Sequence, residues 1–189
     1  MELSSMASFS DAHECEEIPI IAANLHRAIL PRQSQIWAVI RTTDSLKRIA
    51  YSMINTFLGR MCLSGDVTEL SQEQWQIIED GMKFYNRIRS VIKEGQSYRY
   101  GCKIDCIRHP KGWQGVYREG KNGEAFVVIH IFGGDLPEKI VLDLPDARNY
   151  EICEIYSDTD EEVEVKGNQL CYQPKENQKA VAVRFCVTK

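Results

Sequence analysis

The spacing of apolar residues changes once along this chain, close to Gly95. Before Gly95 the apolar residues mostly recur every three or four positions, as they do on one face of a helix. After Gly95 they form short β-rich runs separated by Gly, Pro, Asn and Asp. We therefore predict two parts: an α/β part over residues 1–95 and an antiparallel β part over residues 96–189.

The first part reads as helix, strand, helix, strand, helix. The first helix begins near Glu16 and is closed by Pro31. Two short apolar runs, QIWAVI at 35–40 and RMCLSG at 60–65, are each long enough for a buried strand. Asp44 or Thr43 is expected to cap the second helix, which stops at Gly59, and Ser71 with Gln74 resembles a capping box for the third.

Strands that alternate with helices imply βαβ units and a parallel sheet buried on both faces. Two such strands and three helices cannot cover a parallel sheet by themselves. We therefore expect residues 1–95 to be the last part of a larger α/β domain that lies upstream. Without that domain they should lean on the second part, self-associate or stay partly molten.

The second part is predicted to be an antiparallel β-sandwich that folds independently. It holds about seven β-rich runs at the spacing typical of such domains, from SYRYGCKIDCIR to AVAVRFCV. The segment KNGE at 121–124 carries the Asn-Gly pair that two-residue hairpin turns favour.

Composition excludes several classes of protein. A net charge of −4 offers no broad basic face for nucleic acid, and no segment approaches the roughly 20 apolar residues of a membrane-spanning helix. The N-terminus lacks the pattern of a signal peptide, and seven scattered cysteines favour reduced thiols in a cytoplasm. Cys102 and Cys106 lack a second pair of metal ligands, so we expect them to be buried strand thiols.

The segment SFSDAHE at 8–14 places polar side chains just before an apolar run. One reading is a helix cap, in which Asp11 or Ser10 accepts backbone hydrogen bonds and Glu14 adds favourable charge. The other reading is the edge of an active site, since it gathers carboxylates, a histidine and hydroxyl groups. The residues alone leave both readings open.

Three stretches resemble the C-terminal third of bacterial α-galactosidases of glycoside hydrolase family 36. They are SFSDAHE, IPIIAANLHRAILPRQSQIWAVIR and NTFLGRMCLSGDVTELSQEQW, and the strings LPRQSQIWAV and FLGRMCLSGD occur in the family's order and spacing. The resemblance implies the C-terminal part of a (β/α)8 TIM barrel followed by an antiparallel β-sandwich. Residues 35–40 and 60–65 would be barrel strands seven and eight.

The resemblance also implies a chemistry. Such enzymes hydrolyse terminal α-galactosides, for example melibiose and raffinose, with retention of configuration and with no cofactor or metal. Asp11 matches the acid/base residue, whereas the nucleophilic aspartate would lie upstream of this chain. His13 would hydrogen-bond Asp11 or the sugar, or be an ordinary loop residue. The full-length parent would be a homo-oligomer.

The alternative function is a non-catalytic carbohydrate-binding or interaction module in which only the β-sandwich matters. Four further residues bear on a sugar site. Ser64 and Asp66, on the expected catalytic rim, are assigned to a turn or cap, and Trp37 to packing in the barrel wall. Trp113 is the better exposed aromatic, although the core of the sandwich is its default place.

Overall fold

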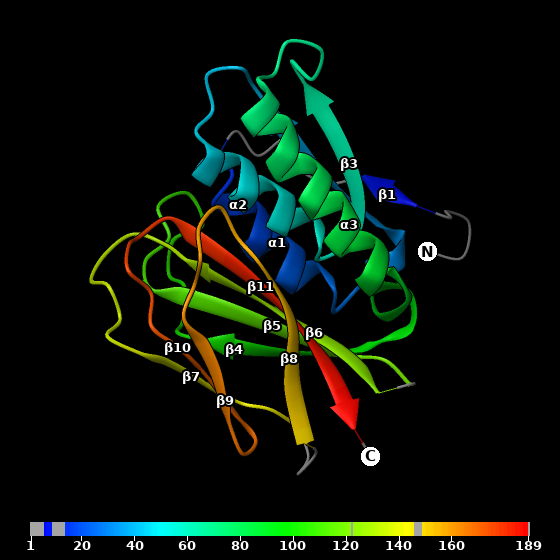
Figure 1. Cartoon of the computed structure of the whole chain (residues 1–189), viewed down its shortest axis with the longest axis vertical. Coiled ribbons are helices and arrows are strands. Elements are labelled where there is room, and N and C mark those ends of the chain that lie inside the picture. The colour runs from blue at the N-terminus through cyan, green and yellow to red at the C-terminus, as the bar shows by residue number, and fades with distance from the viewer. Residues whose placement is uncertain (1–5, 9–13, 122, 146–148, 189) are drawn as a thin grey trace.

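The computed structural model describes residues 6–8, 14–121, 123–145 and 149–188, and shows a mixed α/β protein made mostly of sheets (Figure 1). The first part has the expected order of helices and strands, preceded by one short strand that the sequence did not reveal. Its elements are β1 (Ala7–Ser8), α1 (Glu17–Leu25), the 3₁₀ helix η1 (Pro31–Gln33), β2 (Ser34–Ile40), α2 (Leu46–Thr56), β3 (Arg60–Gly65) and α3 (Gln72–Glu94).

The helix ends differ from expectation at two places. Ser45 caps α2 by accepting a hydrogen bond from the Arg48 amide, so the predicted cap at Asp44 or Thr43 is wrong. The Asp44 carboxylate instead accepts from the Arg41 amide. Helix α1 ends at Leu25, well before Pro31, and the chain continues in a turn. The Ser71–Gln74 capping box of α3 is confirmed.

Strands β1, β2 and β3 form a parallel sheet in that order. Side chains alternate along β2: Ile36, Ala38 and Ile40 are fully buried beneath the helices, whereas Val39 is 47% exposed. The described residues thus leave one face of this sheet uncovered, in line with the expectation that these strands and helices cannot cover it by themselves. The helices cover one face only.

The described residues of the second part form eight antiparallel strands in two sheets. β4 (Gln96–Gly101), β5 (Trp113–Glu119), β6 (Glu124–Ile131), β11 (Lys179–Thr188) and β8 (Asn149–Tyr156) form the larger sheet in that spatial order. β7 (Ile140–Asp143), β10 (Gln169–Tyr172) and β9 (Val163–Lys166) form the smaller one. One predicted run splits into β9 and β10 because the chain reverses at Gly167, whose φ is 63°. Asn122 of the predicted hairpin turn lies outside the described residues.

The larger sheet is the middle layer of the molecule (Figure 1). One of its faces packs against β7, β9 and β10, which is consistent with a β-sandwich. Its other face contributes Val116, Phe126, Val128 and Ala182 to the core beneath α1, α2 and α3. The two parts of the chain thus share one apolar core, so we no longer expect residues 96–189 to fold independently.

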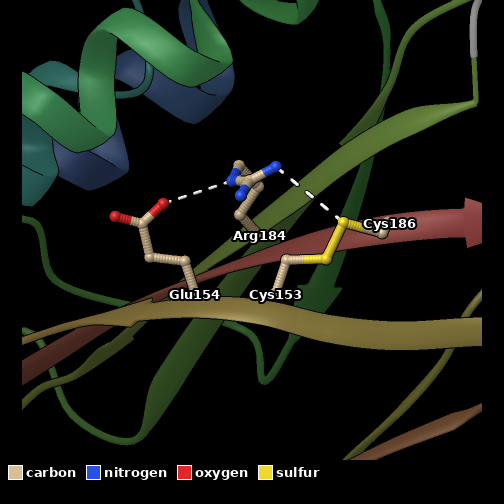
Figure 2. Close-up of a disulfide and its surroundings, with 4 residues drawn as sticks. All are labelled: Cys153, Glu154, Arg184 and Cys186. Atoms are coloured by element: carbon tan, nitrogen blue, oxygen red, sulfur yellow. Dashed lines mark hydrogen bonds and ion pairs between the residues drawn. A yellow bond between two sulfur atoms is a disulfide. The ribbon is translucent and has the colours of Figure 1, made fainter.

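The cysteines depart from the expectation of reduced thiols. Cys153 on β8 and Cys186 on β11 form a disulfide at the edge of the larger sheet, beside the Arg184–Glu154 ion pair (Figure 2). Disulfides persist in oxidising surroundings, so the cysteines no longer argue for a reducing cytoplasm. Cys102 and Cys106 are exposed and lie beyond β4, so their assignment as buried strand thiols is also wrong.

Among the described residues, none of the helices has both the length and the apolar composition needed to cross a membrane.

Candidate active site

The carboxyl ends of the three parallel strands meet at one edge of their sheet. β1 ends at Ser8, β2 at Ile40 and β3 at Gly65, and the loops after β2 and β3 start from this edge. Active sites of parallel α/β proteins gather on such loops. Asp11 follows Ser8 by three residues in the sequence. Asp11 and His13 themselves lie outside the described residues, and their roles stay predictions.

The described residues at both ends of the segment between β1 and α1 are anchored. At its start, the Ser8 hydroxyl accepts a hydrogen bond from Trp37 Nε1 at 3.0 Å. At its end, the Cys15 carbonyl accepts from Asn55 Nδ2 at 2.9 Å, and Arg48 Nη1 lies 3.3 Å from Cys15 Sγ. Burial raises the pKa of Cys15 to about 12, so its thiol stays protonated and serves packing rather than nucleophilic chemistry.

The helices leave one face of the parallel sheet uncovered. In-register neighbours point to the same side of a parallel sheet, so Trp37 and Cys62 share this face, as do Val39 and Ser64. Gln35 also lies here and donates from Nε2 to Cys62 Sγ at 2.6 Å. The face therefore presents an indole ring, an amide and a hydroxyl group rather than a uniform apolar surface.

Trp37 is not among the residues of either apolar core, and its assignment to packing in the barrel wall stays a prediction. It is partly exposed, next to Ser8. Sequence reasoning missed this because Gln35–Ile40 reads as one almost uninterrupted apolar run. The only available signal was the position of Gln35, Trp37 and Val39 at every second residue, between the residues that the structure buries fully.

The turn after β3 closes the rim of the site. Gly65 has a φ of 105°, and a Cβ atom there would meet the Ile40 carbonyl oxygen at 1.9 Å, so a side chain is excluded. The Asp66 amide donates to the Ile40 carbonyl at 2.8 Å, and its carbonyl accepts from Glu69. The turn role predicted for Asp66 is confirmed, while Ser64 lies on the uncovered face.

Trp113 contributes nothing to this edge. It starts β5 and packs, half-buried, against the core between the two antiparallel sheets, which confirms its default assignment. In the described part of the chain, no three His, Cys, Asp or Glu side chains gather in a way that would hold a metal ion.

Comparison with known proteins found matches among solved structures. No protein-family model and no curated protein sequence matches. A raffinose-bound α-galactosidase of glycoside hydrolase family 36 from Geobacillus stearothermophilus matches over 95% of this chain, with a TM-score of 0.71 and 14% identity. The chain has the fold of part of such an enzyme.

Two other structures agree with this α-galactosidase fold. An α-galactosidase from Lactobacillus brevis matches with a TM-score of 0.65 and 12% identity, and the galactosidase domain of an α-galactosidase–sucrose kinase with 0.66 and 15%. Each match covers 95% of this chain. The chain spans about a quarter of the length of these structures (25% or 26%). At such identities the likeness concerns the fold, and activity is argued separately.

Proposed function

We propose that this chain is the C-terminal portion of a retaining α-galactosidase of glycoside hydrolase family 36. In this proposal β1, β2 and β3 are strands six to eight of a (β/α)8 barrel, and β4 to β11 form the sandwich that follows it. One observation carries the proposal: the likeness to these enzymes extends over 95% of the chain and so includes the parallel layer as well as the antiparallel sheets.

The uncovered face of the parallel sheet supports the barrel assignment. In a closed barrel one face of every strand points to the interior, and helices cover the other face. β2 has this division, with Ile36 beneath the helices and Trp37 on the uncovered side. Among the described strands, β1 and β3 are each paired along one edge only, so both edges are available to further parallel strands.

The proposed reaction needs two carboxylates. An upstream aspartate attacks the anomeric carbon and forms a covalent galactosyl-enzyme, while Asp11 donates a proton to the leaving oxygen. Asp11, now a carboxylate, then takes a proton from the water that hydrolyses this intermediate. The place of Asp11 in the sequence, three residues after the end of β1, suits this role.

The proposed substrates are terminal α-galactosides such as melibiose and raffinose. Two of the similar structures hold galacto-oligosaccharides, raffinose in one and stachyose in the other. The leaving group of raffinose is a sugar alkoxide, which is a poor leaving group, so a general acid contributes strongly to its release. A homo-oligomeric parent enzyme, expected from the resemblance, belongs to the same proposal.

Reconstitution tests the proposal. The DNA upstream should encode five further β/α units with an aspartate after the fourth strand. We expect the 189-residue chain alone to leave nitrophenyl α-galactoside intact, because it lacks the nucleophile. Mixed with the separately produced upstream polypeptide, the wild-type chain should restore hydrolysis and the Asp11→Ala chain should not.

The alternative, a non-catalytic carbohydrate-binding module, makes opposite predictions. It requires no upstream barrel, and it requires the chain alone to bind raffinose in a calorimetric titration. That pair of results would overturn the enzymatic proposal.

A further inference from the structure

A cavity of about 540 Å³ opens at the amino ends of β2 and β3, beside the last turns of α3. It lies at the opposite end of the parallel strands from the candidate active site. Four cationic side chains line it: Arg32 before β2, Arg60 at the start of β3, and Arg89 and Lys93 on α3. Gln33, Tyr85 and Ser90 complete its polar lining.

The charges in this cavity have one sign. None of the side chains that line it is a carboxylate, although the chain as a whole carries a net charge of −4. In the described part of the chain, Arg32, Arg60 and Arg89 make no salt bridge, and Lys93 only meets its exposed neighbour Glu94 at 3.4 Å. Like charges gathered around one cavity repel one another, and a bound anion would relieve that repulsion.

Hydrogen bonds hold the walls of the cavity in place. Arg32 Nη1 donates to the Lys93 carbonyl at 3.3 Å, which ties the segment before β2 to the end of α3. The Tyr85 hydroxyl accepts from the Met61 amide at 3.2 Å and donates to the Gly59 carbonyl at 3.3 Å. These contacts hold the amino end of β3 against α3. The cationic groups therefore come from three connected elements: the segment before β2, β3 and α3.

The negative end of the α3 dipole explains part of this arrangement. Cations stabilise the last turn of a helix, and that accounts for Lys93 but not for Arg89, which lies further up α3. It does not account for Arg60, which comes from a strand, and it does not create a cavity. The Ser90 hydroxyl donates to Glu124 Oε2 at 2.9 Å, which places one carboxylate next to the lining residue Ser90.

We propose that this cavity binds a small organic molecule that carries an oxyanion, with phosphate as the best match. Guanidinium groups present planar pairs of N–H donors that fit phosphate oxygens. A volume of about 540 Å³ falls within the range of small-molecule sites and leaves room for an organic group against Ile92 and the Tyr85 ring. The site is separate from the candidate active site and does not depend on the proposed function.

Calorimetric titration of the 189-residue chain at low salt tests the site, with glucose 6-phosphate, inorganic phosphate and glucose as probes. We expect glucose 6-phosphate to bind and glucose to give no heat. Arg60→Gln and Arg89→Gln should each weaken binding about tenfold or more, since each removes a charged donor pair. Lys83→Gln is the matched control, because Lys83 is an exposed cation of α3 that does not line this cavity.

The outcomes separate the possible sources of the anion. Tighter binding of glucose 6-phosphate than of inorganic phosphate supports the organic ligand, whereas equal affinities support the site and identify the free oxyanion as its ligand. The proposal would be overturned if glucose 6-phosphate did not bind at a tenfold excess in the millimolar range. It would also be overturned if neither arginine substitution weakened the binding. Circular dichroism of both variants, whose altered side chains are exposed, checks that they fold.

Discussion

Arg118 Nη2 on β5 lies 2.8 Å from His26 Nδ1, just beyond the end of α1. The guanidinium has only donors, so His26 Nδ1 accepts this hydrogen bond and the imidazole is neutral. Arg118 is fully buried and also donates to the Leu58 carbonyl at 2.7 Å and to Ser97 Oγ at 2.8 Å. Burial, followed by the charge of Arg118, lowers the pKa of His26 to about 3. The pair joins the helices to the larger sheet.

Arg118→Met should therefore lower the free energy of unfolding by about 2 to 4 kcal/mol, because several buried acceptors lose their donor at once. Urea denaturation of the whole chain measures this. Arg99→Met is the matched control: Arg99 is an exposed arginine on neighbouring β4, and its loss should change stability by less than about 0.5 kcal/mol. Equal effects of the two substitutions would show that Arg118 does not join the two layers.

Stability should fall as the pH drops from about 6.5 toward 3. His130 is fully buried, and burial lowers its pKa to about 3, as for His26. In the unfolded chain a histidine has a pKa near 6.5, so between these values the unfolded state binds more protons than the folded state. Each histidine then removes about 1.4 kcal/mol of unfolding free energy per pH unit of acidification.

Replacing His130 shows how much of this pH dependence of stability is due to His130. His130→Phe should make the loss of stability between pH 6.5 and 4 distinctly shallower, as measured by urea denaturation at a series of pH values. His109→Gln, which alters an exposed histidine, should leave the slope unchanged. An unchanged slope in His130→Phe would mean that this ring already accepts a proton in the folded protein.

Lys179 is the centre of a buried ion cluster. Its ammonium group lies 2.8 Å from Asp158 and 3.0 Å from Glu161, and the lysine and glutamate side chains are each 2% exposed. Lys179→Met leaves both carboxylates without their cation and should cost about 3 to 5 kcal/mol. Lys175→Met, at the exposed pair with Glu162, should cost less than about 1 kcal/mol. Thermal or urea unfolding measures both losses. A loss for Lys179→Met no larger than that for Lys175→Met would show that burial does not set the cost.

In the proposed full-length enzyme, Asp11→Ala should slow hydrolysis of raffinose by about 10²- to 10⁴-fold. Substrates with activated aryl leaving groups should suffer far less in the galactosylation step, because they need little protonation. Turnover across a series of leaving groups measures this difference. Equal losses throughout the series would return Asp11 to the capping role that the sequence also allows.

Residues 96–189 produced alone should not form a stable domain. Without the helices, the larger sheet would expose Val116, Phe126, Val128 and Ala182, together with the buried Arg118. Limited proteolysis of the whole chain should therefore give no resistant C-terminal piece, and the isolated segment should aggregate or bind a hydrophobic dye. A protease-resistant piece that begins near Gly95 would restore the independent sandwich expected from the sequence.

Local chemistry determined much of the fold. The apolar spacing is enough to predict α2, α3, β2 and β3, because each of these elements has an apolar face with its own period. The capping box at Ser71 is equally readable, since both of its hydrogen bonds join residues three positions apart. The change of period near Gly95 likewise coincides with the end of α3 and the start of β4.

Contacts between distant residues decided the rest. Which face of β2 is uncovered depends on where the helices pack, so the sequence could not place Trp37 beside Ser8, 29 positions away. Cys153 and Cys186, 33 positions apart, meet only because β8 and β11 are neighbours, and the count of cysteines could not reveal that. The cavity around Arg60 likewise combines side chains from three elements. The sequence by itself determined the local elements through short-range periodicity and capping, whereas only tertiary packing decided how their faces, charges and thiols combine.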